Sequence, residues 1–208
     1  MSYIRSLKAA SAACMLLIGI AGSSVASAKN DPNLIQALKQ STHDTATKTT
    51  DLDHLVWLSS MSEKITQRVP NAFYRIRLLE TVHREAALVG LDPQLVLAVI
   101  DIESNFNRYA LSHVGAQGLM QVMPFWKKEL GKSSDDLFNP QINIRYGCAI
   151  LRHYMDKYSD PVDALAAYNG SLGKEKYPNK VYGRLNRQWG FIKDKYSKHS
   201  DNEVAASH

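Results

Sequence analysis

The chain has 208 residues, a formal net charge of +5 and a hydrophobic content of 45%. The length favours one domain, and the ordinary hydrophobic content excludes a wholly disordered chain. The basic residues form no block or aromatic-interleaved stripe, which argues against nucleic acid as a partner. The sequence also has no glycine-rich phosphate loop, so we expect no nucleotide.

Residues 1 to 28 have the features of a secretory signal. Arg5 and Lys8 supply the positive start, and an apolar run follows from Ala9 to Ala21. Ala26-Ser27-Ala28 then forms a small-residue cleavage site. The apolar run is shorter than the roughly 20 residues that a membrane-spanning helix needs. We therefore expect an exported, periplasmic protein with a cleaved signal, and the alternative is an uncleaved N-terminal anchor.

Cleavage would change both the charge and the cysteine content. The signal carries two basic residues and no acidic one, so its removal lowers the formal net charge from +5 to +3. A mildly basic protein suits an anionic cell-wall polymer, but it equally suits a surface with no particular partner. Cys148 would be the one remaining thiol, and its apolar neighbours predict a buried, unreactive side chain.

The rest of the chain divides into three predicted parts. Residues 29 to 50 are an N-terminal arm or linker, because they become rich in threonine and lose apolar periodicity. Residues 51 to 195 show helical periodicity and form the predicted domain. Residues 196 to 208 form a polar tail.

Two amphipathic helices are predicted at the start of this domain. The first has an apolar stripe made of Leu55, Trp57, Leu58, Met61 and Ile65, and it ends at Pro70-Asn71. The second is expected from Phe73 to Val89, with Gly90 as its C-terminal stop.

Three Asx-Pro pairs predict three further helix starts: Asp92-Pro93, Asn139-Pro140 and Asp160-Pro161. An Asp or Asn side chain caps the first backbone N–H groups, and proline fits the first helical position. The helix from Pro93 is apolar almost all round, which is typical of a buried core helix. Because no strong alternating strand pattern appears, we predict an all-α domain.

Glu103 stands at the end of the predicted buried helix, directly before a turn at Ser104-Asn105. Its neighbours Ile100, Ile102 and Phe106 would half enclose the carboxyl group. Burial disfavours the carboxylate and raises its pKa, which suits a general acid. The alternative is a glutamate that only hydrogen-bonds its helix end or a neighbouring loop.

A second segment, Gly115-Ala116-Gln117-Gly118-Leu119-Met120-Gln121-Val122-Met123-Pro124, begins 12 residues after Glu103. Its glycines permit unusual backbone angles and close approach. Its apolar side chains and the Gln121 amide are consistent with two interpretations. The segment is either a glycine turn that leads into the core or one wall of a sugar-binding cleft.

Three short motifs, in this order and at these distances, resemble the soluble lytic murein transglycosylases: Glu103-Ser104, Gly118-Leu119-Met120-Gln121 and Ala167-Tyr168-Asn169. The similarity extends over about residues 90 to 185. The resemblance implies a single domain with a goose-type-lysozyme-like helical fold, preceded here by the N-terminal arm. It also implies that peptidoglycan glycan strands are the substrate.

The resemblance further implies a role for each matching residue. Glu103 would protonate the oxygen of the β-1,4 bond after N-acetylmuramic acid and then act as base towards that sugar's 6-hydroxyl, which leaves a 1,6-anhydro end. Tyr168 would orient Glu103 or its substrate, and Asn169 and Gln121 would bind sugar amides or hydroxyls. The other expected substrate-binding residues are Ser104, Ser112, Gly118, Leu119, Met120 and Tyr182.

A single carboxylate is enough when the substrate supplies its own nucleophile, whereas ordinary glycosidases use two carboxylates. Asp101 would point roughly 200° round the helix axis from Glu103, and so away from the same cleft. Asp135 and Asp136 are expected to cap or solvate a turn. The seven histidines include no metal-binding pair, so neither a metal nor another cofactor is expected.

The sequence departs from the commonest family pattern at two points. Arg108-Tyr109 stands where a small or proline residue is frequent, and Gly170-Ser171-Leu172-Gly173 replaces the usual Ala-Gly continuation. Both departures concern substrate subsites and leave the expected catalytic group unchanged.

Two other functions stay open at this point. A lysozyme-type hydrolase on the same fold would use water in place of the 6-hydroxyl and would leave reducing ends. A non-catalytic glycan-binding module would have no use for a half-buried acid. We expect a monomer, and a partner in the cell wall or in a secretion machine stays open.

Overall fold

The structure is a computed structural model that describes residues 52 to 190. The predicted signal, arm and tail (residues 1–28, 29–50 and 196–208) lie outside the described residues. The described part forms α2 (Leu52–Ile65), α3 (Ala72–Leu88), α4 (Pro93–Ser104), α5 (Trp126–Leu130), α6 (Pro140–Lys157), α7 (Pro161–Tyr168), α8 (Lys176–Arg184) and a π-helical turn, η2 (Leu185–Trp189).

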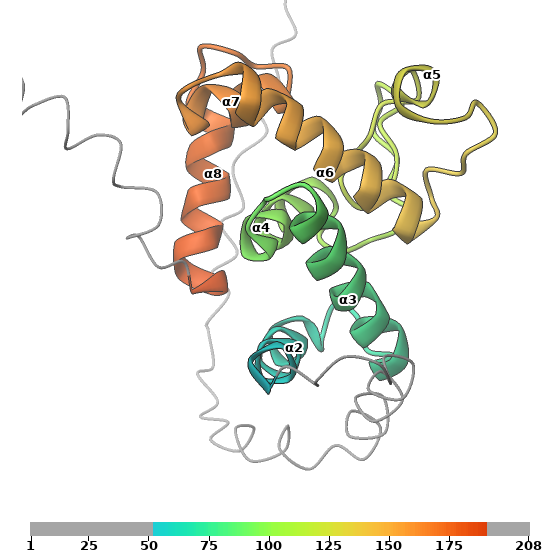
Figure 1. Cartoon of the computed structure of the whole chain (residues 1–208), viewed down its shortest axis with the longest axis vertical. Helices are drawn as coiled ribbons and strands as arrows, with labels where there is room; N and C mark the ends of the chain where they lie inside the picture. The colour runs from blue at the N-terminus through green and yellow to red at the C-terminus, as the bar shows by residue number, and fades with distance from the viewer. Residues whose placement is uncertain (1–51, 191–208) are drawn as a thin grey trace, which may run out of the picture. The chain divides into compact units, whose positions relative to one another are not determined.

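The all-α prediction is confirmed (Figure 1). Between α4 and α5, two isolated β-bridges join Leu111 to Gln117 and Gln117 to Val122, and no longer strand forms in the described part. None of the helices between residues 52 and 190 combines the length and the apolarity of a membrane span.

The three Asx-Pro helices begin at the predicted residues. The Oδ1 atoms of Asp92, Asn139 and Asp160 each accept a hydrogen bond from the backbone N–H two residues later, over 2.8 to 3.0 Å. Each cap satisfies a donor that the helix itself leaves unpaired. The caps therefore determine where α4, α6 and α7 start.

Helix α4 is the central element of the core. Every residue from Leu95 to Asp101 is buried, and α3, α8 and η2 pack against the helix (Figure 1). Burying one Leu, Val or Ile side chain contributes roughly 1.5–3 kcal/mol, so this sequence strongly favours an interior position. The solvent-facing polar groups of α4 are confined to its ends, and Glu103 lies at the C-terminal end.

Asp101, two residues before Glu103, is buried and forms ion pairs with two arginines. Its side chain is 1% exposed and forms ion pairs with Arg68 at 2.7 Å and Arg184 at 3.5 Å. The Arg68 guanidinium also lies 4.8 Å from the centre of the Phe106 ring. These contacts tie α4 to α8 and to the segment after α2.

Helix α4 ends in an abrupt turn. Asn105 and Phe106 have φ angles of +49° and +65°, in the left-handed region that non-glycine residues rarely adopt. The Phe106 ring is buried, with its centre 5.8 Å from that of Trp189. Packing of this ring offsets a backbone cost of roughly 1–2 kcal/mol per residue. The turn therefore leaves Glu103 on the last helical turn, at a fixed position.

Candidate active site

Glu103 lines a cavity of about 290 Å³ at the C-terminal end of α4. The opposite wall comes from the α7–α8 connection and the first half of α8. The other lining residues are Ile102, Asn169, Ser171, Lys174, Lys176, Tyr177 and Lys180. The size is close to the lower limit of small-molecule pockets, about 300 Å³.

Tyr177 holds the Glu103 carboxyl group in place. Its hydroxyl donates a hydrogen bond to Oε1 of Glu103 over 2.6 Å, and its side chain is 7% exposed. Burial, together with the nearby charge of Glu103, raises the pKa of Tyr177 well above its ordinary value. The phenol therefore stays protonated and remains a donor at neutral pH.

Burial raises the pKa of Glu103 to about 7, and the hydrogen bond from Tyr177 acts in the opposite direction. Burial removes water from the charged form, whereas a donor stabilises that form. A carboxyl group with a pKa near 7 is present in both protonation states at neutral pH. It can therefore give a proton and take one back within one reaction cycle.

Tyr168 connects the end of α7 to the loop that contains Gly118 and Gln121. Its hydroxyl donates to the carbonyl oxygen of Met120 over 2.8 Å. Burial is the main cause of its strongly raised pKa, and the charge of Glu103 adds to it. Tyr168 thus lies near Glu103, but its hydrogen bond goes to the loop.

The same loop is attached to α4 and α6. The Ser104 hydroxyl donates to the Leu119 carbonyl oxygen over 2.8 Å, and Asn143 Oδ1 accepts from the Met120 N–H over 2.8 Å. The side chains of Leu119 and Met120 have no exposed surface. These two side chains therefore support the loop from the core side.

The side chains of Gln121 and Ser112 both form hydrogen bonds with the backbone of the segment between α4 and α5. Gln121 has a φ of +49°, and its Nε2 donates to the carbonyl oxygens of Gly118 and Ala110 over 3.0 and 3.1 Å. Ser112 Oγ accepts from the N–H of Ala116 over 2.9 Å. Neither residue lines the cavity of Glu103.

Of the other predicted site residues, Asn169 lines the Glu103 cavity and Tyr182 does not. The Asn169 amide donates to Ser171 Oγ over 3.1 Å. Tyr182 lines a separate cavity of about 80 Å³, together with Leu91 and Leu95. The structure thus brings Glu103 and Asn169 together and places Tyr182 elsewhere.

Tyr177 was not identified from the sequence. The available signal was its spacing, because Tyr177, Val181 and Leu185 recur every four residues and are all buried. Pro178 is compatible with a helix here because it lies in the first turn of α8. The spacing predicts a buried tyrosine, but it does not show which acid that tyrosine meets.

The rim of the cavity is basic. Lys174, Lys176 and Lys180 are exposed, and none of them forms an ion pair with a residue between 52 and 190. Glu103 is the one acidic residue of the described chain among the lining residues. Such a rim favours a ligand that carries negative charge.

Comparison with known families gives a match that includes every residue that lines the Glu103 cavity. The sequence profile of the transglycosylase SLT domain matches residues 80–189. The chain belongs to this family. The matched part contains Glu103, the loop from Gly118 to Gln121, Tyr168 and Tyr177.

Several known proteins are similar to this SLT-domain chain. It is 39% identical over 118 residues to a transglycosylase of Enterobacteria phage PRD1, over 53% of this chain and 44% of that protein. It is 37% identical over 114 residues to the membrane-bound lytic murein transglycosylase C of Histophilus somni (strain 2336), over 47% of this chain and 31% of that protein. The chain thus spans less than half the length of these curated relatives.

The solved structures similar to this chain include a lytic transglycosylase. The lytic transglycosylase Slt of Pseudomonas aeruginosa has 28% sequence identity with it and a TM-score of 0.42. The alignment covers 78% of this chain and 25% of that one.

The fit of Gly118 in the loop predicts a large effect of one added methyl group. Gly118 has a φ of +75°, and a Cβ there would collide with the Asn143 side chain and the Leu137 carbonyl oxygen. Gly118→Ala should lower the free energy of unfolding by about 2–4 kcal/mol, from overpacking and backbone strain together. Gly115→Ala is the control, because Gly115 has a φ of +88° with open space around it. Equal losses in urea unfolding would contradict the packing described here.

The pKa of Glu103 predicts a pH-dependent stability. An ordinary glutamate has a pKa of 4.5, and that of Glu103 is about 7 in the folded protein, so the folded state binds the proton more tightly. The wild type should therefore lose stability relative to Glu103→Gln as the pH rises from about 4.5 to above 7. At about 1.4 kcal/mol per unit, the relative loss is of the order of 3 kcal/mol.

Urea unfolding of both proteins at about pH 4.5 and about pH 8 measures this difference. The stability of Glu103→Gln relative to the wild type should increase with pH. A difference that does not change with pH would show that the carboxyl group is not desolvated.

Proposed function

We propose that this protein is an exported peptidoglycan lytic transglycosylase. It cleaves the β-1,4 bond between N-acetylmuramic acid and N-acetylglucosamine and leaves a 1,6-anhydromuramic end. The observation that carries this proposal is the half-buried carboxyl group of Glu103 in a cavity of an SLT domain, with a pKa of about 7 and a hydrogen bond from Tyr177.

In the first step, protonated Glu103 donates its proton to the glycosidic oxygen. The bond from C1 of N-acetylmuramic acid to that oxygen breaks, and the N-acetylglucosamine side leaves as an alcohol. Positive charge develops at C1, as in glycoside cleavage generally. The new carboxylate keeps the hydrogen bond from Tyr177, which stabilises the charged form.

In the second step, the Glu103 carboxylate removes the proton of the 6-hydroxyl of N-acetylmuramic acid. The oxygen of that hydroxyl forms the new bond to C1 and closes the anhydro ring. Glu103 is again protonated, so the cycle is balanced and consumes no water. One group acts as acid and then as base, which a pKa near 7 permits in both directions.

The surroundings of Glu103 support a mechanism with one carboxylate. Asp101 is buried in ion pairs with two arginines. Asp135 accepts hydrogen bonds from Tyr146 and the Lys132 N–H, and Asp136 caps the following turn. Within residues 52–190, no second acid lines the cavity. The 6-hydroxyl of the substrate therefore replaces the enzyme nucleophile or base of ordinary glycosidases.

The remaining predicted residues have supporting roles in this proposal. Asn169 lies in the cavity and offers an amide to the N-acetyl groups of the substrate. Ser104, Tyr168 and the loop residues Gly118, Leu119 and Met120 hold one side of the site in position. Gln121, Ser112 and Tyr182 would contact parts of the glycan strand further from the cleaved bond.

The names of the relatives and the predicted signal support the location. Two relatives are named as membrane-bound lytic murein transglycosylases, C and F. Residues 1 to 28 have the pattern of a secretory signal. We infer that the protein acts in the periplasm as a monomer on glycan strands, without a metal or other cofactor.

The direct test is product analysis. Purified peptidoglycan sacculi are incubated with the wild type, with Glu103→Gln and with Glu129→Gln, which changes an exposed glutamate outside the cavity. Mass spectrometry should find anhydro-ended fragments from the wild type and Glu129→Gln. Release by Glu103→Gln should fall by at least about 100-fold, because general acid–base catalysis contributes 10²–10⁴-fold. Fragments with reducing ends would instead show a lysozyme-type hydrolase.

A further inference from the structure

A second cavity, of about 430 Å³, lies between the first turns of α3 and the start of α6. It shares no lining residue with the Glu103 cavity. Two arginines line it, Arg77 from α3 and Arg108 from the segment after α4, and no acidic residue does. We call this cavity the arginine cleft.

Arg77 and Arg108 both have guanidinium N–H groups that can donate hydrogen bonds to a ligand in the arginine cleft. Arg77 is exposed and forms no ion pair with any described residue. The Arg108 guanidinium lies 4.8 Å from the ring centre of Tyr109 and 6.0 Å from that of Tyr74, so two aromatic rings orient it. Arg108 Nε is buried and has no hydrogen-bond partner within residues 52–190.

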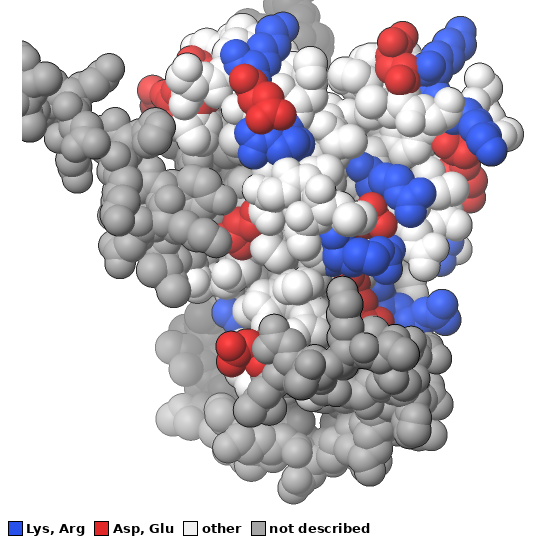
Figure 2. All heavy atoms as spheres, in the orientation of Figure 1, with Lys and Arg blue, Asp and Glu red and all other residues white. Residues whose placement is uncertain are grey.

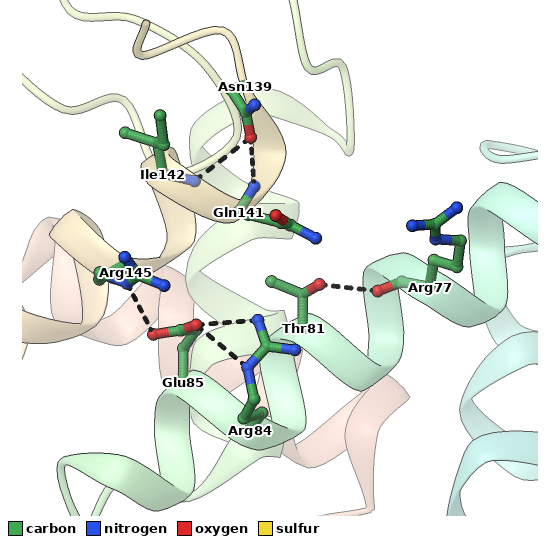
Figure 3. A network of polar contacts seen from close by, with 8 residues as sticks. All are labelled: Arg77, Thr81, Arg84, Glu85, Asn139, Gln141, Ile142 and Arg145. Atoms are coloured by element: carbon green, nitrogen blue, oxygen red, sulfur yellow. Dashed lines mark hydrogen bonds and ion pairs between the residues drawn. The ribbon is translucent and has the colours of Figure 1, made fainter. Parts of the chain in front are cut away.

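Two neighbouring arginines, Arg84 and Arg145, differ from Arg77 and Arg108 because they are already paired with an acid. Arg84 and Arg145 form ion pairs with Glu85 at 2.9 and 3.3 Å, and the Glu85 side chain is 3% exposed (Figure 3). Basic side chains are prominent over the region of α3 and α6 in Figure 2. The Glu85 carboxylate pairs with Arg84 and Arg145, whereas Arg77 and Arg108 pair with no acid in the part of the chain that the structure describes.

The other polar groups of the arginine cleft also favour an acceptor ligand. The side chains of Gln141 and Arg77 face one another in Figure 3, and both line the arginine cleft. The Thr81 hydroxyl donates to the Arg77 carbonyl oxygen. Asn139 uses its oxygen for the helix cap, which leaves its NH₂ group for a ligand. Guanidinium groups bind carboxylates through two parallel hydrogen bonds.

The arginine cleft also has an apolar side. Phe73, Leu78 and Pro140 line it, and they suit short aliphatic groups beside the charged ones. A ligand with carboxylates on a backbone of small side chains matches both halves of the cavity. Among the parts of peptidoglycan, the stem peptides have this chemistry, whereas the glycan hydroxyls do not.

We propose that the arginine cleft binds the stem peptides of peptidoglycan through their carboxylate groups. This inference rests on the proposed function for the identity of the polymer. The cleft would hold the wall at a place separate from the cleaved bond and would keep the enzyme on peptide-bearing strands. Arg108 is also a position at which this sequence departs from the commonest family pattern.

The test is direct binding of free stem peptides, released from sacculi by an amidase, to the full chain by calorimetry. The double variant Arg77→Gln/Arg108→Gln should weaken binding by at least about tenfold, because it removes two charge-assisted contacts. Arg187→Gln, an exposed arginine of η2 outside the cleft, should bind like the wild type. Peptides with methyl-esterified carboxylates should bind as weakly as the double variant binds free peptides.

Arg77→Gln alone provides a check on folding, because the Arg77 side chain is exposed and its loss should leave the fold intact. This variant should weaken binding by about threefold or more with an unchanged unfolding midpoint. Equal peptide affinity in all variants would overturn the inference. Binding of inorganic phosphate without binding of stem peptides would also overturn it, and would assign the cleft to a phosphate-bearing ligand.

Cleavage assays separate this inference from the proposed function. Arg77→Gln should cut peptide-free glycan strands at the wild-type rate and should cut sacculi more slowly at low protein concentration. If the wild type binds stem peptides but cuts no substrate, the proposed function is contradicted and the inference about the arginine cleft is retained. If the wild type cuts sacculi but binds no stem peptide, the inference about the arginine cleft is contradicted and the proposed function is retained.

Discussion

Burial of helix α4 is the constraint on which the rest of the structure depends. Its apolar residues occupy the centre of the core, so polar groups are accommodated only at its ends or in ion pairs. The two acids near its C-terminal end illustrate both solutions. Asp101 is buried and neutralised by Arg68 and Arg184. Glu103, two residues later, pairs with no cation among residues 52–190 and has a pKa of about 7. One helix thus carries a carboxylate in structural ion pairs and the carboxyl group that we propose as the catalytic one.

The site around Glu103 is assembled from segments that are distant in the sequence. Tyr177 comes from α8 and donates to the carboxyl group, while Tyr168 and Ser104 hold the loop of residues 118–121. Of these side chains, Tyr177 belongs to the core and Tyr168 packs against it. The Glu103 carboxyl group can therefore remain partly desolvated without losing its orientation, which is the arrangement that the proposed acid and base catalysis by one group requires.

Local signals in the sequence predicted most of the fold. The Asx-Pro pairs placed the starts of α4, α6 and α7 correctly, because capping is determined by adjacent residues. The sequence also indicated Glu103, from its position at the end of an apolar helix. Helix α8, Tyr177 and the arginine cleft were not predicted, because they depend on contacts between α4 and α8 or between α3 and α6. Periodicity identifies a buried face, but it does not identify the residue that this face meets.

The most direct test of the central claim is the pKa of Glu103 itself. A carbon-detected NMR titration of the glutamate carboxyl groups, assigned by comparison with Glu103→Gln, would give this value in the free protein. Our account predicts one glutamate that titrates near pH 7 and is missing from the spectrum of the variant. A Glu103 that titrates near its ordinary pKa of 4.5 would show a solvated carboxylate and would contradict the account.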